Sequence, residues 1–422
     1  MIKKDIIKCL KANKDVTGYE IKIIDKDSRE LFYVLNHLEI NRAVKTKVTT
    51  VTVYNSDGKT TGSSTFAINA ADSISSLKGK IKAAIKMAKS SRNQYYPLVD
   101  KKVNIKESKP KIANLNDTAC DIARAVFKAN IYKDGWINST EIFVSAFKNE
   151  FINSNGVNHV SYSYKVQIEV IPTWSNSKKE EFELYKFYES NEVNLNNITN
   201  EVDEILNLAK ARSIAVKPSE VKIPKNVPVL IKNDMRDLLV KYIAKELNYQ
   251  TIYLKYNHYS LNDVLSKNPF DLTMKGSIKG CIDSAKYDNN GIVLPSKTIV
   301  KAGVAKAIYG SKRFGYYLNQ KNITGLFPVC ELKAKGIDYQ NKKHIIIETF
   351  SSPQLEDNSG YWGGEVRLAR YFDGKKYIPL TNFSISGDFF KDLKTVEFSK
   401  EITTSNSYKG PKYLIFKGIK IY

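Results

Sequence analysis

An alternation of β-branched and polar residues marks residues 47–54 (KVTTVTVY), as a half-buried strand requires. A turn at residues 55–58 (NSDG) leads to a second run at residues 63–69, so this pair predicts a β-hairpin. Asp72 or Ser73 can cap the helix that follows. That helix carries one apolar stripe, made of Ile74, Leu77, Ile81, Ala84, Ile85 and Ala88. The pattern predicts a lobe in which strands and one helix share a core.

The same order of strand, turn, strand and amphipathic helix occurs again after a lysine-rich connector at residues 100–111. Here the turn is residues 153–156 (NSNG), and the predicted strands are residues 139–151 and 157–172. The remaining patterns of this half predict strands at residues 19–24 and 30–38 and helices at residues 118–129 and 199–213. The repetition predicts two similar lobes, although no fixed period supports a solenoid.

The pattern changes near residue 221, where Pro218, Pro224 and Pro228 mark a domain boundary. A short strand at residues 227–231 and a helix at residues 234–247 are followed by short β runs and glycine turns. We predict an α+β fold, in which two strand-helix lobes precede a β-rich domain of mixed topology. The predicted units are residues 1–104, 112–217 and 222–422.

The length of 422 residues agrees with more than one domain, because one hydrophobic core stops growing at roughly 250 to 300 residues. No run approaches the roughly 20 apolar residues of a membrane-spanning helix, and the amino terminus (MIKKDIIKCLKANK) lacks the apolar centre of a secretory signal. We therefore expect a cytoplasmic protein. Its four cysteines are far apart, which predicts reduced thiols and neither a disulfide framework nor a zinc knuckle.

The net charge of +22 raises the possibility of nucleic-acid binding, because clustered cations release counterions from phosphates. Only nine of the 66 basic residues are arginines, however, and arginine is the usual reader of phosphates and bases. The lysines are scattered singly and in pairs. This distribution favours a solvated lysine surface over a groove for an acidic partner, and it makes nucleic acid an unfavoured ligand.

Residues that usually carry hydrolytic chemistry form no recognisable local pattern. The four histidines, at positions 37, 159, 258 and 344, are too far apart for two of them to bind zinc from one helix. His258 and Cys330 are the most suggestive single residues, but a hydrogen-bonded histidine and a packed thiol are the simpler interpretations. The sequence also has no glycine-rich phosphate loop and no GxSxG motif.

A series of short motifs keeps one order along nearly the whole chain. They are residues 53–62 (VYNSDGKTTG), 153–156, 288–291 (DNNG), 299–303, 324–325, 364–369, 373–374, 384–387 and 410–411. In this order they resemble the TldD/PmbA family, once called modulators of DNA gyrase and understood as metallopeptidase assemblies. The longest block, residues 287–325, supplies two tight turns and a glycine-spaced basic segment.

The resemblance is incomplete at the metal site of the family. Catalytic members carry His-Glu-x-x-x-His on a helix early in the third segment, whereas the corresponding helix here reads LLVKYIAK at residues 238–245. The resemblance therefore points to the PmbA branch, also called TldE, whose members lack the motif. It implies no metal ligand in this chain, and zinc is expected only in a catalytic partner. The implied role is a non-catalytic subunit that encloses an unfolded peptide with a TldD-like subunit, or as a homodimer.

An extended peptide can bind by adding a strand to an exposed sheet edge. The glycine-flanked run at residues 360–371 (GYWGGEVRLARY) is our candidate edge, because paired glycines permit a close approach of two backbones and the tryptophan offers an aromatic contact. The predicted peptide-binding residues are Trp362, Gly363, Gly364, Glu365 and Arg367. An ordinary hairpin with a core tryptophan is the alternative.

Two other functions stay open at this point. A self-sufficient peptidase would need Cys330 or His258 to converge with Glu348, which a sequence alone does not reveal. A basic module that binds nucleic acid would agree with the older family name and with the excess of lysine.

Overall fold

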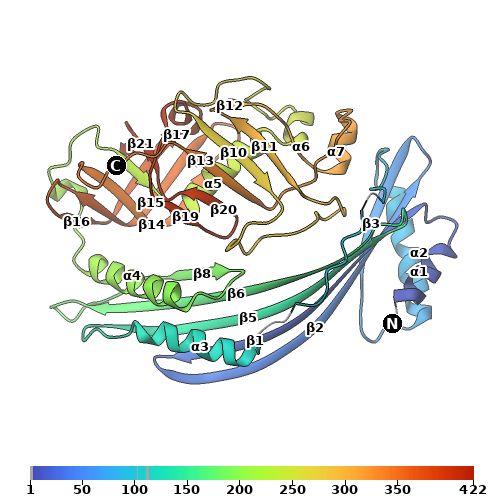
Figure 1. The fold of residues 1–422 in the computed structure, drawn as a ribbon, viewed down its shortest axis with the longest axis horizontal. Coiled ribbons are helices and arrows are strands. Elements are labelled where there is room, and N and C mark those ends of the chain that lie inside the picture. The colour runs from blue at the N-terminus through green and yellow to red at the C-terminus, as the bar shows by residue number, and fades with distance from the viewer. Residues whose placement is uncertain (1–2, 102, 111–113) are drawn as a thin grey trace.

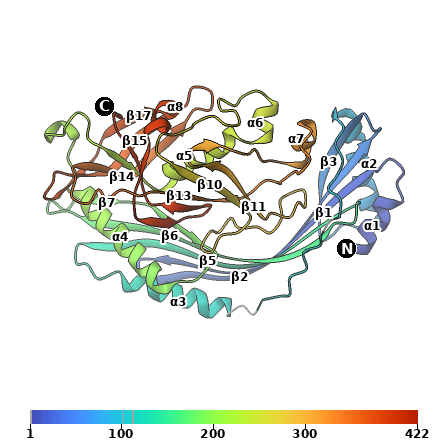
Figure 2. The same ribbon diagram turned by 45° about the horizontal axis from the view of Figure 1, so that its top comes forward.

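A long, curved sheet forms the N-terminal half of the protein, and the C-terminal half lies in the hollow of its curve (Figures 1 and 2). The structure is a computed structural model that describes residues 3–101, 103–110 and 114–422. This description leaves out residues 102 and 111 of the predicted connector. It also leaves out residues 112 and 113, with which the second predicted unit begins. Helix makes up 23% and strand 42%, which confirms the predicted α+β class with a strand-rich C-terminal half.

The N-terminal sheet is antiparallel, and its central strand comes from the first predicted lobe. Strand β1 pairs with β2 on one side and with β5, from the second predicted lobe, on the other. In spatial order the strands are β4 (Arg92–Gln94), β3 (Thr60–Ile68), β2 (His37–Ser56), β1 (Gly18–Val34), β5 (Gly135–Asn153), β6 (Asn158–Ser175) and β7 (Glu181–Glu183), with β8 (Lys186–Ser190) also paired to β6. The strands of both predicted lobes therefore share one sheet, and the division into three units stays a prediction.

Several predicted elements are longer in the structure than in the sequence patterns. The two strands predicted at residues 19–24 and 30–38 are wrong as separate elements, because β1 runs without interruption to Val34 and Leu38 already belongs to β2. The predicted hairpin around residues 55–58 is confirmed as β2 and β3, and Ser73 caps the following helix by accepting a hydrogen bond from the Ser76 amide. The second hairpin is confirmed as β5 and β6.

Four helices cover one face of this sheet at its two ends. Helices α1 (Lys3–Lys11) and α2 (Ile74–Ser90) share a core with β1 and β2 at one end. At the other end α3 (Leu115–Lys128) and α4 (Leu195–Ser213) share a core with β5 and β6. Both α3 and α4 begin a few residues before the apolar stripes that predicted them, because Asn114 and Asn194 cap them.

The C-terminal half contains two further sheets around helix α5 (Asn233–Glu246), whose apolar residues share one core cluster with both. One sheet has the order β12 (Val304–Ala305), β11 (Ser296–Lys301), β10 (Phe270–Lys275), β13 (Val329–Ala334), β20 (Tyr408–Pro411) and β19 (Ile402–Thr404). The other has the order β18 (Glu397–Phe398), β21 (Leu414–Phe416), β9 (Val229–Ile231), β14 (His344–Leu355), β15 (Tyr361–Phe372), β17 (Phe383–Asp388) and β22 (Lys420–Ile421), with β16 (Tyr377–Leu380) also paired to β15. Short helices α6 (Tyr249–Tyr253), α7 (Lys312–Tyr317) and α8 (Phe389–Asp392), and 3-10 turns at Pro218–Glu220 and Leu393–Thr395, complete this half.

A buried group of charges connects the two halves of the chain. Lys232, directly after β9, pairs with Glu348 on β14 and, at 3.2 Å, with Glu204 on α4. The Glu348 carboxylate also accepts a hydrogen bond of 2.6 Å from Arg370 on β15. Burial alone lowers the pKa of Lys232, but the carboxylates of Glu348 and Glu204 raise it above its ordinary value. The ammonium therefore stays charged inside the protein, and α4 is held against the C-terminal sheet.

Replacement of Glu348 by Gln should lower the free energy of unfolding by about 3–5 kcal/mol, because Lys232 and Arg370 would then share a buried site without their carboxylate. Urea denaturation followed by circular dichroism measures the change. Glu365→Gln is the matched control, because this carboxylate is exposed on the same sheet, and it should leave the midpoint unchanged. Equal midpoints for the two variants would contradict a structural role of the charge group.

Candidate functional site

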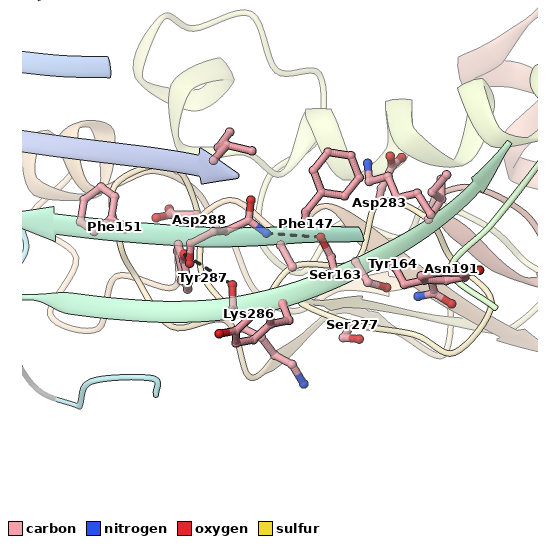
Figure 3. Close-up of a pocket in the computed structure, with 18 of the residues that line it drawn as sticks. Phe147, Phe151, Ser163, Tyr164, Asn191, Ser277, Asp283, Lys286, Tyr287 and Asp288 are labelled. Atoms are coloured by element: carbon pink, nitrogen blue, oxygen red, sulfur yellow. Dashed lines mark hydrogen bonds between the residues drawn. The ribbon is translucent and has the colours of Figure 1, made fainter. Parts of the chain in front are cut away.

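A cleft of about 600 Å³ lies between the N-terminal sheet and a loop of the C-terminal half (Figure 3). Its sheet wall consists mainly of alternate residues of three adjacent strands, which share one face because side chains alternate along a strand. These residues are Lys22 and Ile24 of β1, Phe147, Asn149 and Phe151 of β5, and Ser161, Ser163 and Lys165 of β6. We call this side of the sheet the inner face. The opposite wall is the loop of residues 277–289.

The loop is held by the turn that the sequence motif DNNG predicted. The buried carboxylate of Asp288 accepts hydrogen bonds from the backbone amides of Asn290, Ile292 and Leu326 at 2.9–3.1 Å. Burial raises the pKa of Asp288, and these hydrogen bonds oppose the shift. Gly291 has a φ of +83°, and a Cβ atom there would lie 2.3 Å from the Phe151 ring. Only glycine therefore lets the turn pack directly on β5.

His159 connects β6 to the same turn from beneath the cleft. Its Nδ1 accepts a hydrogen bond of 3.0 Å from the Ile105 amide, so Nε2 carries the proton and donates to the Gly291 carbonyl at 2.9 Å. The ring lies 4.7 Å from that of Tyr287, whose hydroxyl donates to the Asn149 carbonyl at 3.1 Å. Burial lowers the pKa of His159. His159 is thus a neutral residue that connects the sheet to the loop by hydrogen bonds from both of its ring nitrogens.

A second buried carboxyl lies on the inner face of β1 at the end of the cleft. Glu20 is 3% exposed and accepts a hydrogen bond of 3.0 Å from the Tyr54 hydroxyl. Burial raises its pKa to about 7, although the Tyr54 hydrogen bond and the charge of Lys22 act in the opposite direction. Glu20 therefore changes its charge close to neutral pH.

The open part of the cleft offers groups for hydrogen bonding and stacking. Asn149 donates a hydrogen bond to Ser163 at 3.3 Å, and both residues line the sheet wall. Phe147 adds an aromatic face near Ser163 (Figure 3). Lys22 and Lys165 belong to this wall and make no ion pair within residues 3–101, 103–110 and 114–422. The cleft combines aromatic, amide and hydroxyl groups with two lysines outside ion pairs and with the exposed carboxylate of Asp283, a mixture that suits an extended chain with polar groups along its length.

The predicted peptide-binding segment is not a free sheet edge, and that prediction is wrong. Strand β15, which carries it, pairs with β14 on one side and with β17 on the other. Trp362 has no exposed surface, and its indole N–H donates to Asp392 at 2.8 Å, so the alternative of a core tryptophan is the better description. Gly363 and Gly364 permit a close backbone approach, but the neighbours are β17 and β14. Glu365 and Arg367 are exposed, and peptide binding by them stays a prediction.

The residues proposed for a self-sufficient peptidase have separate partners. Cys330 is buried in β13, where burial raises the pKa of its thiol to about 12, the reverse of an activated nucleophile. His258 lies beside Phe390, with its Nδ1 3.3 Å from Glu246, and Glu348 belongs to the buried charge group. No hydrogen bond or ion pair joins any two of the three residues. The constellation that this alternative requires is therefore not assembled.

Helix α5 occupies the position that the resemblance assigned to the metal helix. Lys241 and Lys245 are exposed on it, and they border a pocket of about 200 Å³ together with Asn248, Cys330 and Ser407. Across the part of the chain that the structure describes, no group of three or more His, Cys, Asp or Glu residues is placed to hold a metal ion. Across the same part, no helix is both long and apolar enough to cross a membrane.

Comparison with known proteins connects this architecture to one class. TldE from Thermococcus kodakarensis has a similar structure, with a TM-score of 0.80 at 13% identity and 99% coverage of both chains. The second similar structure is a protein of Thermotoga maritima that is described as a candidate modulator of a DNA gyrase. Its TM-score is 0.77 at 12% identity, over 99% of this chain and 100% of the other. A protein of Bacteroides thetaiotaomicron with a similar description has a TM-score of 0.78 at 14% identity, over 99% of this chain and 97% of the other. The protein thus has the fold of TldE and of proteins described as modulators of DNA gyrase.

Residues 224–422 match the family model described as the PmbA/TldA metallopeptidase C-terminal domain. This C-terminal part of the chain belongs to the TldD/PmbA family, which the ordered motifs predicted. None of the curated proteins that were compared matches it.

The residues of the cleft wall are the part of the site that the sequence predictions missed. Strands at residues 139–151 and 157–172 were predicted, and their alternation already implies that Phe147 and Asn149 share a face, as do Ser161 and Ser163. The pattern did not show which face would meet the loop at residues 277–289. The only signal was the DNNG turn itself, whose glycine needs a close neighbour.

Replacement of His159 by Gln should lower the free energy of unfolding by about 1–3 kcal/mol at pH 8, because two buried hydrogen bonds are disturbed. The difference from the wild type should shrink as the pH falls from about 7 to 5. In this pH range the His159 ring becomes protonated in the unfolded chain, whereas in the folded protein burial lowers its pKa and the ring stays neutral. Proton uptake therefore favours the unfolded state, and the wild type loses the stability that His159 contributes.

Thermal melts at pH 8 and pH 5.5 measure this effect. His37→Gln is the control, because His37 is exposed and makes neither of the two buried hydrogen bonds, and at pH 8 it should leave the melting temperature unchanged. The opposite effect of Glu20, whose raised pKa favours stability at low pH, is present in all three proteins and cancels in the comparison. A His159→Gln difference that stays constant with pH would contradict the neutral connector.

Proposed function

We propose that this protein is a non-catalytic, TldE-like subunit that holds an unfolded peptide for a TldD-like metallopeptidase in the cytoplasm. The observation that carries the proposal is the cleft, which joins the inner face of the sheet to the DNNG loop and leaves two lysines available. Helix α5, with Lys241 and Lys245 exposed, supports the assignment of cleavage to a partner that carries the metal motif.

The chemistry of the cleft favours a peptide in an extended conformation. A strand-like peptide places alternate side chains toward one wall, where Phe147 can stack on an apolar or aromatic side chain. The carbonyl and amide groups of the peptide can bond to Asn149 and Ser163, and neither group selects a particular sequence. Lys22 and Lys165 favour acidic side chains or a terminal carboxylate. This combination suits unfolded segments of varied sequence.

Fluorescence anisotropy with a labelled, unstructured acidic peptide tests the holding function. Phe147→Ala and Lys165→Ala should each weaken binding about 5- to 10-fold, because each removes one contact worth roughly 1 kcal/mol or slightly more. Lys178→Ala is the control for charge, since Lys178 is exposed on a turn outside the cleft. Binding that is unchanged in both cleft variants would contradict the cleft as the holding site.

The division of labour is tested separately, by metal analysis and peptide cleavage with the purified chain. We expect no stoichiometric zinc and no cleavage by the chain alone, and cleavage once a TldD-like subunit with the His-Glu-x-x-x-His motif is added. Zinc at one equivalent together with cleavage by the chain alone would overturn the non-catalytic assignment, whatever the binding assay shows.

A further inference from the structure

Helices α1 and α2 and the loop after α1 carry a concentration of positive charge. Residues 3–16 and 74–90, which make up this part of the chain, hold ten lysines and two aspartates, and no arginine or glutamate. The remaining residues hold 56 of the 66 basic residues and 42 of the 44 acidic ones, so their charges are much closer to balance. More than a third of the net charge of +22 thus belongs to less than a tenth of the chain. We call residues 3–16 and 74–90 the lysine surface.

The exposed lysines of each helix lie along one side of it, since residues three or four positions apart share a side. Seven of the ten lysines are exposed and make no ion pair within residues 3–101, 103–110 and 114–422. They are Lys4, Lys8 and Lys11 of α1, Lys14 of the loop, and Lys78, Lys82 and Lys86 of α2. Of the two aspartates, Asp15 pairs with Lys89 at 2.9 Å, and Asp5 is half-buried. The lysine surface therefore presents seven cations outside ion pairs.

The lysine surface lies on the side of the N-terminal sheet opposite to the cleft. Apolar residues of α1 and α2 share a core with Tyr19, Ile21 and Ile23 of β1, whereas the cleft wall uses Lys22 and Ile24. Alternate residues of a strand point to opposite faces, so the sheet separates the two helices from the cleft. In Figures 1 and 2, α1 and α2 lie side by side at the end of the molecule that is far from the two C-terminal sheets.

A groove of about 480 Å³ lies between α2 and the loop after α1. It combines three lysines with apolar residues of α2, and its lining consists of Asn13, Asp15, Gly79, Lys82, Ala83, Ile85, Lys86 and Lys89. The one carboxylate of this lining, that of Asp15, is paired with Lys89. Phospholipids place an anionic phosphate directly beside the carbon atoms of the glycerol and the acyl chains. A surface that joins lysines to a small apolar groove is therefore complementary to an anionic bilayer.

The residue types of the lysine surface favour lipid over nucleic acid. Arginine, whose planar fork binds phosphates and bases with two hydrogen bonds, is absent from residues 3–16 and 74–90, and so are the aromatic residues on which bases stack. A lysine ammonium is a compact charge on a flexible stem, so it can follow fluid headgroups without a fixed geometry. Clusters of about four to eight basic residues on an amphipathic helix are typical of binding to an anionic membrane surface.

We propose that the lysine surface docks reversibly on a bilayer rich in anionic lipid, with its lysines at the level of the headgroups and no segment inserted across the membrane. The attraction is electrostatic and has no covalent anchor, so it is reversible and depends on salt. Because the sheet lies between the two helices and the cleft, the cleft is on the far side of the sheet from the bilayer and stays accessible. This inference does not rest on the proposed function.

Sedimentation of the full chain with lipid vesicles tests the docking. At about 0.1 M salt the protein should bind vesicles in which about a third of the lipid is phosphatidylglycerol, and it should not bind vesicles of phosphatidylcholine alone. Salt at about 1 M should release it, because the screening length falls from about 10 Å to about 3 Å. Equal binding to both kinds of vesicle, or binding that salt does not weaken, would overturn the proposal.

Two double variants with the same change of charge locate the surface. Lys82→Gln with Lys86→Gln should bind the anionic vesicles roughly 10- to 30-fold more weakly, because each lysine contributes about a factor of five. The matched control is Lys178→Gln with Lys179→Gln, on the turn between β6 and β7, where both lysines are exposed, and it should bind as the wild type does. Equal thermal melts show that all three proteins are folded. Equal losses in the two double variants would contradict docking through α1 and α2.

Competition with a DNA duplex distinguishes the two kinds of polyanion. When its phosphates equal the phosphatidylglycerol in number, the duplex should displace little of the wild type from the vesicles, because the lysine surface lacks arginine and aromatic residues. Retention on the vesicles supports the lipid. Complete displacement, together with DNA binding that the Lys82→Gln, Lys86→Gln variant loses, would assign the surface to nucleic acid and overturn the proposal.

Discussion

Pairing of β1 on both sides is the constraint on which the rest of this structure depends. Residues of β1 bond to β2 from one side and to β5 from the other along nearly the same stretch, so two segments that look like separate lobes in sequence become one sheet. The helices then fill only the two ends of one face. The other face stays available along the middle of the curve, and the C-terminal half occupies that hollow.

The cleft and the buried charge group are two results of this docking. The loop of residues 277–289 reaches the inner face only because Gly291 allows the turn to lie against Phe151. At the far end, the Lys232 ammonium needs carboxylates from both halves to stay charged away from water. The contact of Gly291 with Phe151 is tight packing, and the pairing of Lys232 with Glu204 and Glu348 is electrostatic. Together they fix the position of the C-terminal half relative to the N-terminal sheet.

Local patterns predicted most elements because the physics that forms them is local. The NSDG and NSNG turns, the Ser73 cap and the apolar stripe of α2 need only near neighbours, and the structure confirms them except for Ile74, which is exposed at the first turn of the helix. The union of the lobes, the interior place of β15 and the burial of Trp362 depend on partners distant in sequence. A run rich in glycine and aromatic residues fits a free edge and a crowded interior equally well, so residues 360–371 were predicted as an edge although β15 lies inside the sheet.

The long-range partnership of β1 also has a consequence in time. Its second partner, β5, lies more than 100 residues further along the chain, since Val34 faces Ser139 and Glu20 faces Asn153. A ribosome adding 5–20 residues per second makes the β1–β2 hairpin roughly 5–20 seconds before β5 emerges. During that interval both borders of the nascent hairpin are bare over much of their length, which leaves their amide and carbonyl groups open to pairing with a neighbouring polypeptide.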